Sequence, residues 1–120
     1  MFACLTVPSN DPEVLEAVLE GVTVANHIFL TRKRYPPLYQ SGVRYKPEPK
    51  ERWLFIPQIL ARGWDDCEGL AGWRAAEYRM VGIPARVHVV EGRIGRWHAV
   101  VLLPGGRIED PSARLGMRTS

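Results

Sequence analysis

Three residues that lie far apart in the chain have the side-chain types needed for nucleophilic acyl transfer: Cys67, His98 and Asp110. A free cysteine thiol has a pKa of about 8.5, so attack by sulfur needs a neighbour that stabilises the thiolate or removes the proton. An imidazole does this, and a carboxylate on its second nitrogen fixes the tautomer and stabilises the charged ring. In this interpretation Cys67 is the nucleophile, His98 is the general acid and base, and Asp110 orients the imidazole.

The segment around the cysteine predicts the start of a helix. In 63-GWDDCEGLAGWRAAEYRMVGIPAR-86, Asp65 or Asp66 is a suitable N-cap, and the helical pattern continues to Met80. Gly82 and the proline after Ile83 predict where that helix ends. A helix N-terminus favours an anion such as a thiolate, whereas the flanking carboxylates raise the thiol pKa. A cationic partner is therefore expected beside the sulfur.

The histidine and the aspartate belong to the segment 98-HAVVLLPGGRIED-110, which predicts a strand, a turn and a return strand. A turn centred near Pro104 places His98 opposite Asp110 on one face of the hairpin, and a slip by one residue separates them. Glu109 is then expected on the opposite face, in solvent. Of the other histidines, His88 has no carboxylate placed in this way, and His27 lies on the polar side of a predicted helix.

The sequence also offers candidates for oxyanion stabilisation and substrate contact. Backbone N–H groups at the start of the Cys67 helix are expected to form part of an oxyanion hole. Further donors are Gln58, Trp64 or an aromatic residue of the long loop that precedes them. Trp97, beside His98, is a candidate to shield the imidazole from water, although it is most simply a core residue, as is Trp73.

The elements that must position these residues follow from hydrophobic periodicity and turn signals. The predicted order is helices first and a small antiparallel sheet last, which is an α+β fold in a single domain over residues 1–120. The predicted helices are 11–30, 57–63 and a third from 65 or 66 to 80; the predicted strands are 85–92, 96–106 and 107–111, and an extended proline-rich loop covers 35–53.

Composition narrows the function classes. The chain has 120 residues, 46% of them hydrophobic and 24% charged, with a net charge of +3. The first residues resemble no secretory signal and no membrane span is predicted, so a soluble protein of the cytoplasm is expected. Cys4 and Cys67 are too few for a disulfide framework. The basic residues are dispersed except for 32-RKR-34, which argues against a specific nucleic-acid groove.

Several short motifs occur in an order that resembles the transglutaminase-like superfamily. They are the run from Gly63 to Cys67, the pair Leu70-Ala71, then 82-GIPARV-87, 97-WHAVV-101 and 109-EDPS-112. The resemblance implies a papain-like core that carries a Cys–His–Asp triad, a peptide or protein substrate and no cofactor. Two features depart from the family pattern: Val100 stands where an aromatic residue is frequent, and the cysteine-to-histidine spacing is short.

A second resemblance concerns the N-terminal half. The segment 35-YPPLYQSGVRY-45 is similar to small stand-alone members of the superfamily encoded in tailed phages and prophages. It implies phage structural proteins, such as those of the tail, as partners, and a location in the host cytoplasm or the phage particle.

The expected activity is that of a cysteine peptidase or amidase, and the sequence leaves hydrolysis and transamidation both open. Three alternatives remain beside it. The fold can serve as a catalytically silent structural or binding module. Zinc ligation by Cys67, His88, His98 and an aspartate lacks any recognised ligand spacing, so no metal site is expected. A nucleic-acid binder has little support from the charge pattern.

Overall fold

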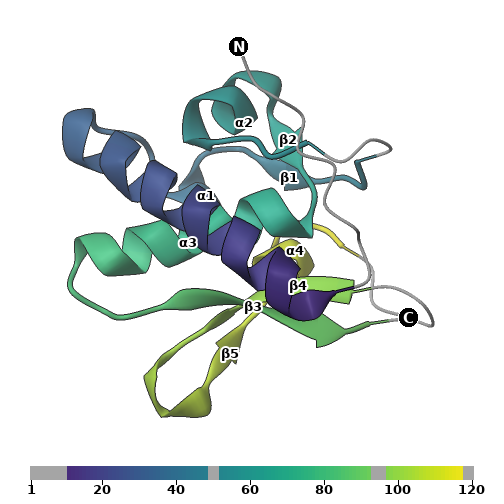
Figure 1. Cartoon of the computed structure of the whole chain (residues 1–120). Coiled ribbons are helices and arrows are strands. Elements are labelled where there is room, and N and C mark those ends of the chain that lie inside the picture. Colours follow the sequence, from purple (N-terminus) through teal and green to yellow (C-terminus); the bar gives the residue numbers. More distant parts are fainter. Residues whose placement is uncertain (1–10, 49–51, 93–96, 118–120) are drawn as a thin grey trace.

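The computed structural model describes residues 11–48, 52–92 and 97–117 and has an α+β fold (Figure 1). Cys4, part of the predicted loop and the first residue of the strand expected from residue 96 lie outside the described residues. The helices are α1 (Pro12–Arg32), α2 (Ile56–Arg62), α3 (Cys67–Met80) and α4 (Pro111–Arg114), with 3-10 turns η1 (Leu38–Gln40) and η2 (Pro104–Gly106). The strands are β1 (Arg44–Tyr45), β2 (Trp64–Asp65), β3 (Arg86–Glu91), β4 (Trp97–Leu102) and β5 (Ile108–Glu109).

The two long helices begin and end at the residues that the local signals indicated. Asp11 caps α1 by accepting a hydrogen bond from the Glu13 N–H at 3.0 Å. Asp66 caps α3 in the same way. Gly82 follows α3 with φ of 81°, a left-handed conformation that glycine adopts without strain and that ends the helix.

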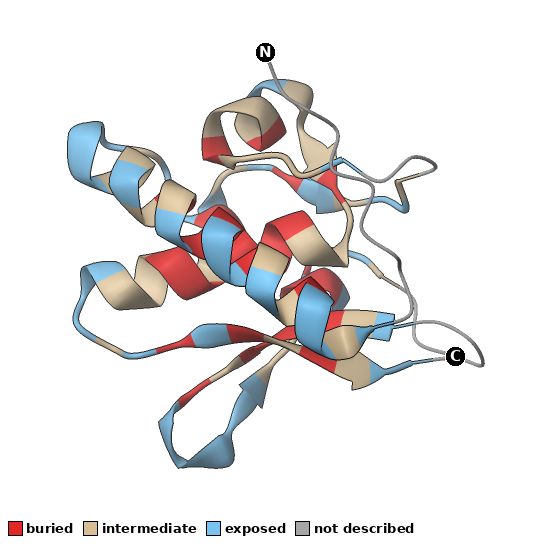
Figure 2. Ribbon diagram, in the orientation of Figure 1, coloured by how far each residue is buried: buried red, intermediate tan, exposed pale blue. Residues whose placement is uncertain are grey.

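The helices and the sheet enclose two clusters of buried apolar residues (Figures 1 and 2). In the first cluster α1 packs on α3 and on β3, and α3 packs on β4. The second cluster lies between α2, α3 and the segment after α1, and it contains the fully buried Trp73. Tyr35, Tyr39 and Tyr45 pack against this second cluster, so these aromatic residues anchor the proline-rich loop.

The buried face of α1 includes polar as well as apolar residues. Thr23 and Asn26 are buried together with Leu15, Leu19 and Val22. Asn26 Oδ1 accepts a hydrogen bond of 3.0 Å from the Ile56 N–H, and so joins α1 to the start of α2. By length and composition alone α1 could also cross a membrane, a test that core helices and signal sequences pass as well.

The main sheet has the order β3-β4-β5 with antiparallel pairing, as predicted, but the centre of its second turn lies one residue later than expected, which moves the register by two residues. β5 pairs Glu109 with Val101 and Ile108 with Leu102, so the turn is centred at Gly105 instead of Pro104. Extending this register places Asp110 beside Val100. His98 is two residues from Val100 and therefore on the same face, because side chains alternate along a strand. The directly opposite pairing was wrong, but the shared face is preserved.

Two further elements were not predicted. Within the loop, β1 pairs in parallel with β2, which carries Trp64 and Asp65. The strand predicted over residues 107–111 ends at Glu109, and the short helix α4 begins at Pro111 with Asp110 as its N-cap. Both elements bring segments distant in the chain next to the start of α3.

Candidate active site

His98 and Asp110 form a hydrogen-bonded pair across the β4–β5 hairpin. The distance from His98 Nε2 to Asp110 Oδ2 is 2.8 Å, and the two side chains are 18% and 28% exposed. The other carboxylate oxygen of Asp110, Oδ1, accepts from the Ala113 N–H at 3.3 Å and caps α4. When Nε2 donates to Asp110, Nδ1 keeps a lone pair and is the basic nitrogen of the ring.

Cys67 is the first residue of α3, and its free thiol is half-buried against the first cluster. The backbone N–H of Ala99, the residue after His98, lies beside this sulfur and acts to lower the thiol pKa. This N–H is available because β5 pairs with β4 only at Val101 and Leu102 in the described chain. The structure thus brings Cys67 to the strand that carries His98, although no direct hydrogen bond joins the two side chains within the described residues.

The electrostatic setting of the sulfur opposes ionisation. Burial raises the pKa of the Cys67 thiol to about 12, and the carboxylates of Asp66, Glu68 and Asp110 raise it further, against the opposing effect of the Ala99 N–H. The sequence predicted the effects of the helix start and of the acids but not the burial, which is the largest cause. At neutral pH the resting residue is therefore a thiol.

The start of α3 leaves one backbone donor for an oxyanion. Asp66 Oδ1 accepts from the N–H groups of Glu68 and Gly69 at 3.1 and 3.4 Å. The next N–H, of Leu70, donates to the Asp66 carbonyl. Among the described residues, no oxygen accepts a hydrogen bond from the N–H of Cys67 itself. Of the backbone N–H groups at the start of α3, the Cys67 N–H is therefore the one that remains free to bind an oxyanion.

The contacts that the structure gives to the side chains proposed as further donors are with residues other than Cys67. Gln58 Oε1 accepts from the Phe55 N–H at 2.8 Å at the start of α2. The Trp64 ring lies under the Arg62 guanidinium at 3.5 Å and the Lys46 amine at 5.9 Å. No contact in the described residues directs either side chain to Cys67.

Trp97 and Trp73 have opposite environments. Trp73 is fully buried, as expected. Trp97 is 37% exposed, so its assignment to the core was wrong. Its position on β4 before His98, lining a small cavity with Glu68 and Ala99, keeps it as a candidate for substrate contact.

Glu109 was expected in solvent and is instead only 10% exposed. Its carboxylate accepts from the Tyr39 hydroxyl at 2.5 Å, from Arg74 Nε at 2.6 Å and from the Tyr78 hydroxyl. Burial raises its pKa, but these hydrogen bonds outweigh burial and hold the pKa below its usual value. Because Arg74 and Tyr78 belong to α3, Glu109 connects the helix of Cys67 to the strand that leads into Asp110.

Asp65 lies fully buried beneath the start of α3 and does not cap it. Its Oδ1 accepts from Arg62 Nη2 and from the Asp66 N–H, both at 2.8 Å, while burial raises its pKa to about 8. A Cβ at Gly69 would lie 1.7 Å from Asp65 Oδ2, so the carboxylate fits only because residue 69 is glycine. In the sequence, the only indication that the Asp65 carboxylate lies beneath the helix was a glycine four residues after it, at position 69.

A second histidine–carboxylate pair, missed from the sequence, lies at the β3 edge of the sheet. His88 Nδ1 is 2.7 Å from Glu16 Oε2 of α1, and the same oxygen accepts from the Val89 N–H at 2.8 Å. Arg86, an exposed residue of β3, also pairs with Glu16, at 3.1 Å. Across the described residues, no three histidine, cysteine, aspartate or glutamate side chains gather as ligands for a metal ion.

Comparisons of the chain with protein-family models, with curated proteins and with solved structures found no match. The resemblance to the transglutaminase-like superfamily therefore stays a prediction from the motifs.

Proposed function

We propose that the protein is a cysteine-dependent acyl-transfer enzyme that hydrolyses an amide or peptide bond through a thioester. The observation that carries the proposal is the 2.8 Å His98–Asp110 pair on the strand whose Ala99 N–H contacts the Cys67 sulfur. A nucleophile, a base and an orienting carboxylate gathered at one place are the minimum for this chemistry. In this proposal the fold is a minimal papain-like core of transglutaminase-like type.

The raised thiol pKa determines how the reaction starts. The Cys67 proton passes to His98 Nδ1 while Sγ forms a bond to the substrate carbonyl carbon, so no stable thiolate is needed. Asp110 stabilises the imidazolium that results. The Cys67 N–H donates a hydrogen bond to the carbonyl oxygen and so stabilises the negative charge that develops there.

The remaining steps return the enzyme to its initial state. The imidazolium gives its proton to the leaving nitrogen, the carbon–nitrogen bond breaks, and the acyl group remains on sulfur as a thioester. Water attacks this thioester while His98 takes its proton, the carbon–sulfur bond breaks, and the proton returns to sulfur. An amine in place of water would give transamidation through the same intermediate.

The test is acylation of Cys67 by an activated ester such as p-nitrophenyl acetate, followed by intact-protein mass spectrometry across pH. We expect an acyl adduct on Cys67 that is absent in Cys67→Ser. We also expect a rate that levels off well below the raised thiol pKa, because the imidazole and not a free thiolate starts the reaction. A rate that rises tenfold per pH unit up to pH 10 would show an unassisted buried thiol and would contradict the proposal.

One observation favours a second function, a catalytically silent fold that serves as a structural or binding module, for example beside tail proteins in a phage particle. The observation is that Cys67 packs against the first cluster with a thiol pKa raised to about 12. In this case Cys67 acts as a small apolar residue, and the unassisted pH profile is the expected result. The same experiment thus separates the two functions.

A further inference from the structure

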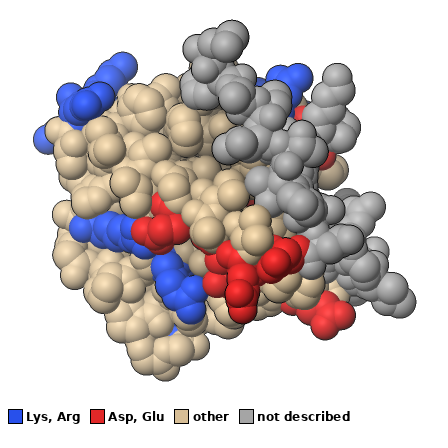
Figure 3. Space-filling model, in the orientation of Figure 1, with Lys and Arg blue, Asp and Glu red and all other residues tan. Residues whose placement is uncertain are grey.

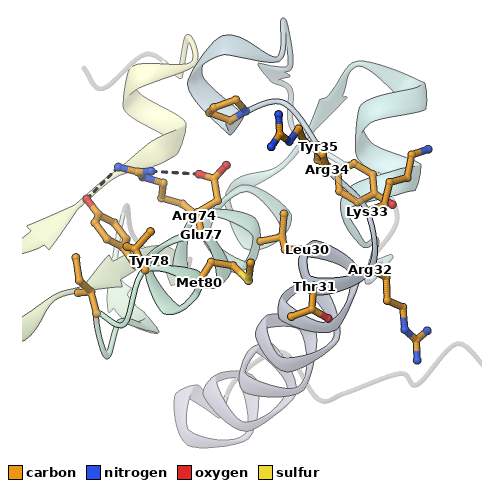
Figure 4. A pocket seen from close by; sticks show the side chains of 13 residues that line it. Leu30, Thr31, Arg32, Lys33, Arg34, Tyr35, Arg74, Glu77, Tyr78 and Met80 are labelled. Atoms are coloured by element: carbon orange, nitrogen blue, oxygen red, sulfur yellow. Dashed lines mark hydrogen bonds and ion pairs between the residues drawn. The ribbon is translucent and has the colours of Figure 1, made fainter.

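A groove remote from Cys67 opens between the carboxyl end of α1 and the second half of α3 (Figure 4). Its volume is about 720 Å³. Leu30 and Met80 face it from the two helices, and Val81 and Ile83 extend the apolar lining beyond α3. Val81 is 72% exposed and Met80 is 42% exposed, so this lining leaves large apolar side chains in water. Such exposure is typical of a binding surface.

The rim of this groove is basic. Arg32, Lys33 and Arg34 form the cluster noted in the sequence, and all three are exposed at the edge of the molecule where α1 ends (Figure 3). Within the described residues none of the three makes an ion pair, whereas Arg74 in the opposite wall is held by Glu77 and Glu109. In Figure 4, Arg34 lies above the opening, and Arg32 and Lys33 project outward. Arg34 can therefore contact a ligand, and the other two attract negative charge from a distance.

The backbone at the end of α1 favours an acidic peptide over a compact anion such as phosphate. The end of α1 presents carbonyl groups, and its capping N–H, of Lys33, already donates to the Phe29 carbonyl. Carbonyls at a helix C-terminus carry partial negative charge and accept hydrogen bonds from N–H groups. A phosphate would be repelled there, whereas a peptide brings backbone N–H donors to those carbonyls and places its carboxylates farther out, near the arginines.

We propose that this groove binds a peptide segment that carries acidic residues around a bulky apolar side chain. The apolar side chain fills the space between Leu30 and Met80, and the acidic residues face Arg34 and its neighbours. Lipid tails fit less well, because a hydrocarbon chain offers no partner to the exposed basic groups of the rim. The proposal does not depend on acylation of Cys67.

The test uses fluorescence anisotropy with three labelled ten-residue peptides at low salt. The first has glutamates around Leu-Phe, the second has glutamines in place of the glutamates, and the third has alanines in place of Leu-Phe. We expect the first to bind with a Kd of about 10–100 μM, typical of a transient contact. We expect the second and third to bind at least about tenfold more weakly, and added salt to weaken the first.

Two variants locate the binding, and a third is the matched control. Lys33→Gln with Arg34→Gln, and separately Val81→Asp, should each weaken the acidic peptide about tenfold or more. Arg107→Gln, an exposed arginine outside the groove, should leave its binding unchanged. No saturable binding up to about 1 mM, equal binding of the glutamine peptide, or insensitivity to the groove variants would overturn the proposal. Binding to anionic phosphatidylserine vesicles without binding to the peptide would also overturn it.

Discussion

The molecule holds two histidine–carboxylate pairs, and their surroundings differ more than their geometry. His98–Asp110 and His88–Glu16 have nitrogen–oxygen distances of 2.8 and 2.7 Å. His98 is 18% exposed, on the strand whose Ala99 N–H contacts the Cys67 sulfur. His88 is 34% exposed at the sheet edge, where Glu16 also accepts from the Val89 N–H and from Arg86.

The difference shows that the geometry of a paired imidazole does not by itself indicate a function. At the β3 edge the carboxylate completes the hydrogen bonding of an otherwise unpaired strand N–H, a structural task. At the β4–β5 hairpin each oxygen of Asp110 has one partner, and one of these is a ring whose other nitrogen is basic. The two places are distinguished by the Cys67 thiol beside the strand of His98, and not by the pair distance.

The largest expected contrast is between His98→Ala and His88→Ala. Removing the proposed general base should slow acylation of Cys67 by roughly 10²–10⁴-fold, while His88→Ala should leave the rate unchanged. The measurement is the rate of adduct formation by mass spectrometry at pH 7, with circular dichroism to confirm folding. Equal losses in the two variants would remove the basis for treating the pairs differently.

The carboxylate partners give the next contrast. Asp110→Asn should slow acylation by at least roughly 10²-fold, because asparagine no longer fixes the tautomer or stabilises the imidazolium. Asparagine remains a good N-cap for α4, so stability should change little. Glu16→Gln should leave acylation unchanged but lower the urea midpoint. A D110N protein that reacts at the original rate would exclude Asp110 from the mechanism.

Glu109 provides a contrast in stability and in its pH dependence. Glu109→Gln should lose roughly 1.5–3 kcal/mol at pH 7, because three donors lose a buried carboxylate. The pKa of folded Glu109 lies below its usual 4.5, so its contribution is complete above that pH and is lost as the pH falls through the folded value. The variant's urea midpoint should therefore fall less steeply than the original's below pH 4.5. Urea midpoints that fall equally steeply with pH in the variant and in the original protein would contradict this expectation.

Arg86→Ala should have the smallest effect. Its ion pair with Glu16 is exposed, since the Arg86 side chain is 49% accessible, and such pairs contribute less than about 1 kcal/mol. The expected change in the urea midpoint is close to the experimental error of that measurement, and it vanishes in high salt. A loss comparable to that of Glu109→Gln would mean that the edge pair is much more tightly organised than its exposure indicates.

Much of the fold could be predicted because its signals are local. Asp11 before Pro12, Asp66 before Cys67, and Gly82 after α3 each determine a helix boundary through interactions within a few residues. Alternation of apolar residues gave the three strands. The sequence also predicted correctly that His98 and Asp110 share a face of the hairpin. Side chains alternate between the two faces, so the observed register shift of two residues leaves both on the same face.

What could not be predicted depends on residues brought together by packing. Glu109 is buried because Tyr39, Arg74 and Tyr78 converge on it from two other elements, and no short pattern links the four. His88 meets Glu16 only because α1 packs on β3. The thiol pKa of Cys67 was misjudged for the same reason, since burial is a property of the folded neighbourhood.

The double use of Asp110 has a practical consequence for handling this protein. One oxygen holds the His98 ring and the other holds the first turn of α4, and just beyond that turn the Leu115 carbonyl accepts from the Tyr45 N–H at 2.9 Å. Asp110 thus links α4 directly to the imidazole. Insertions between residues 111 and 114 would therefore disturb the alignment of the ring as well as the short helix.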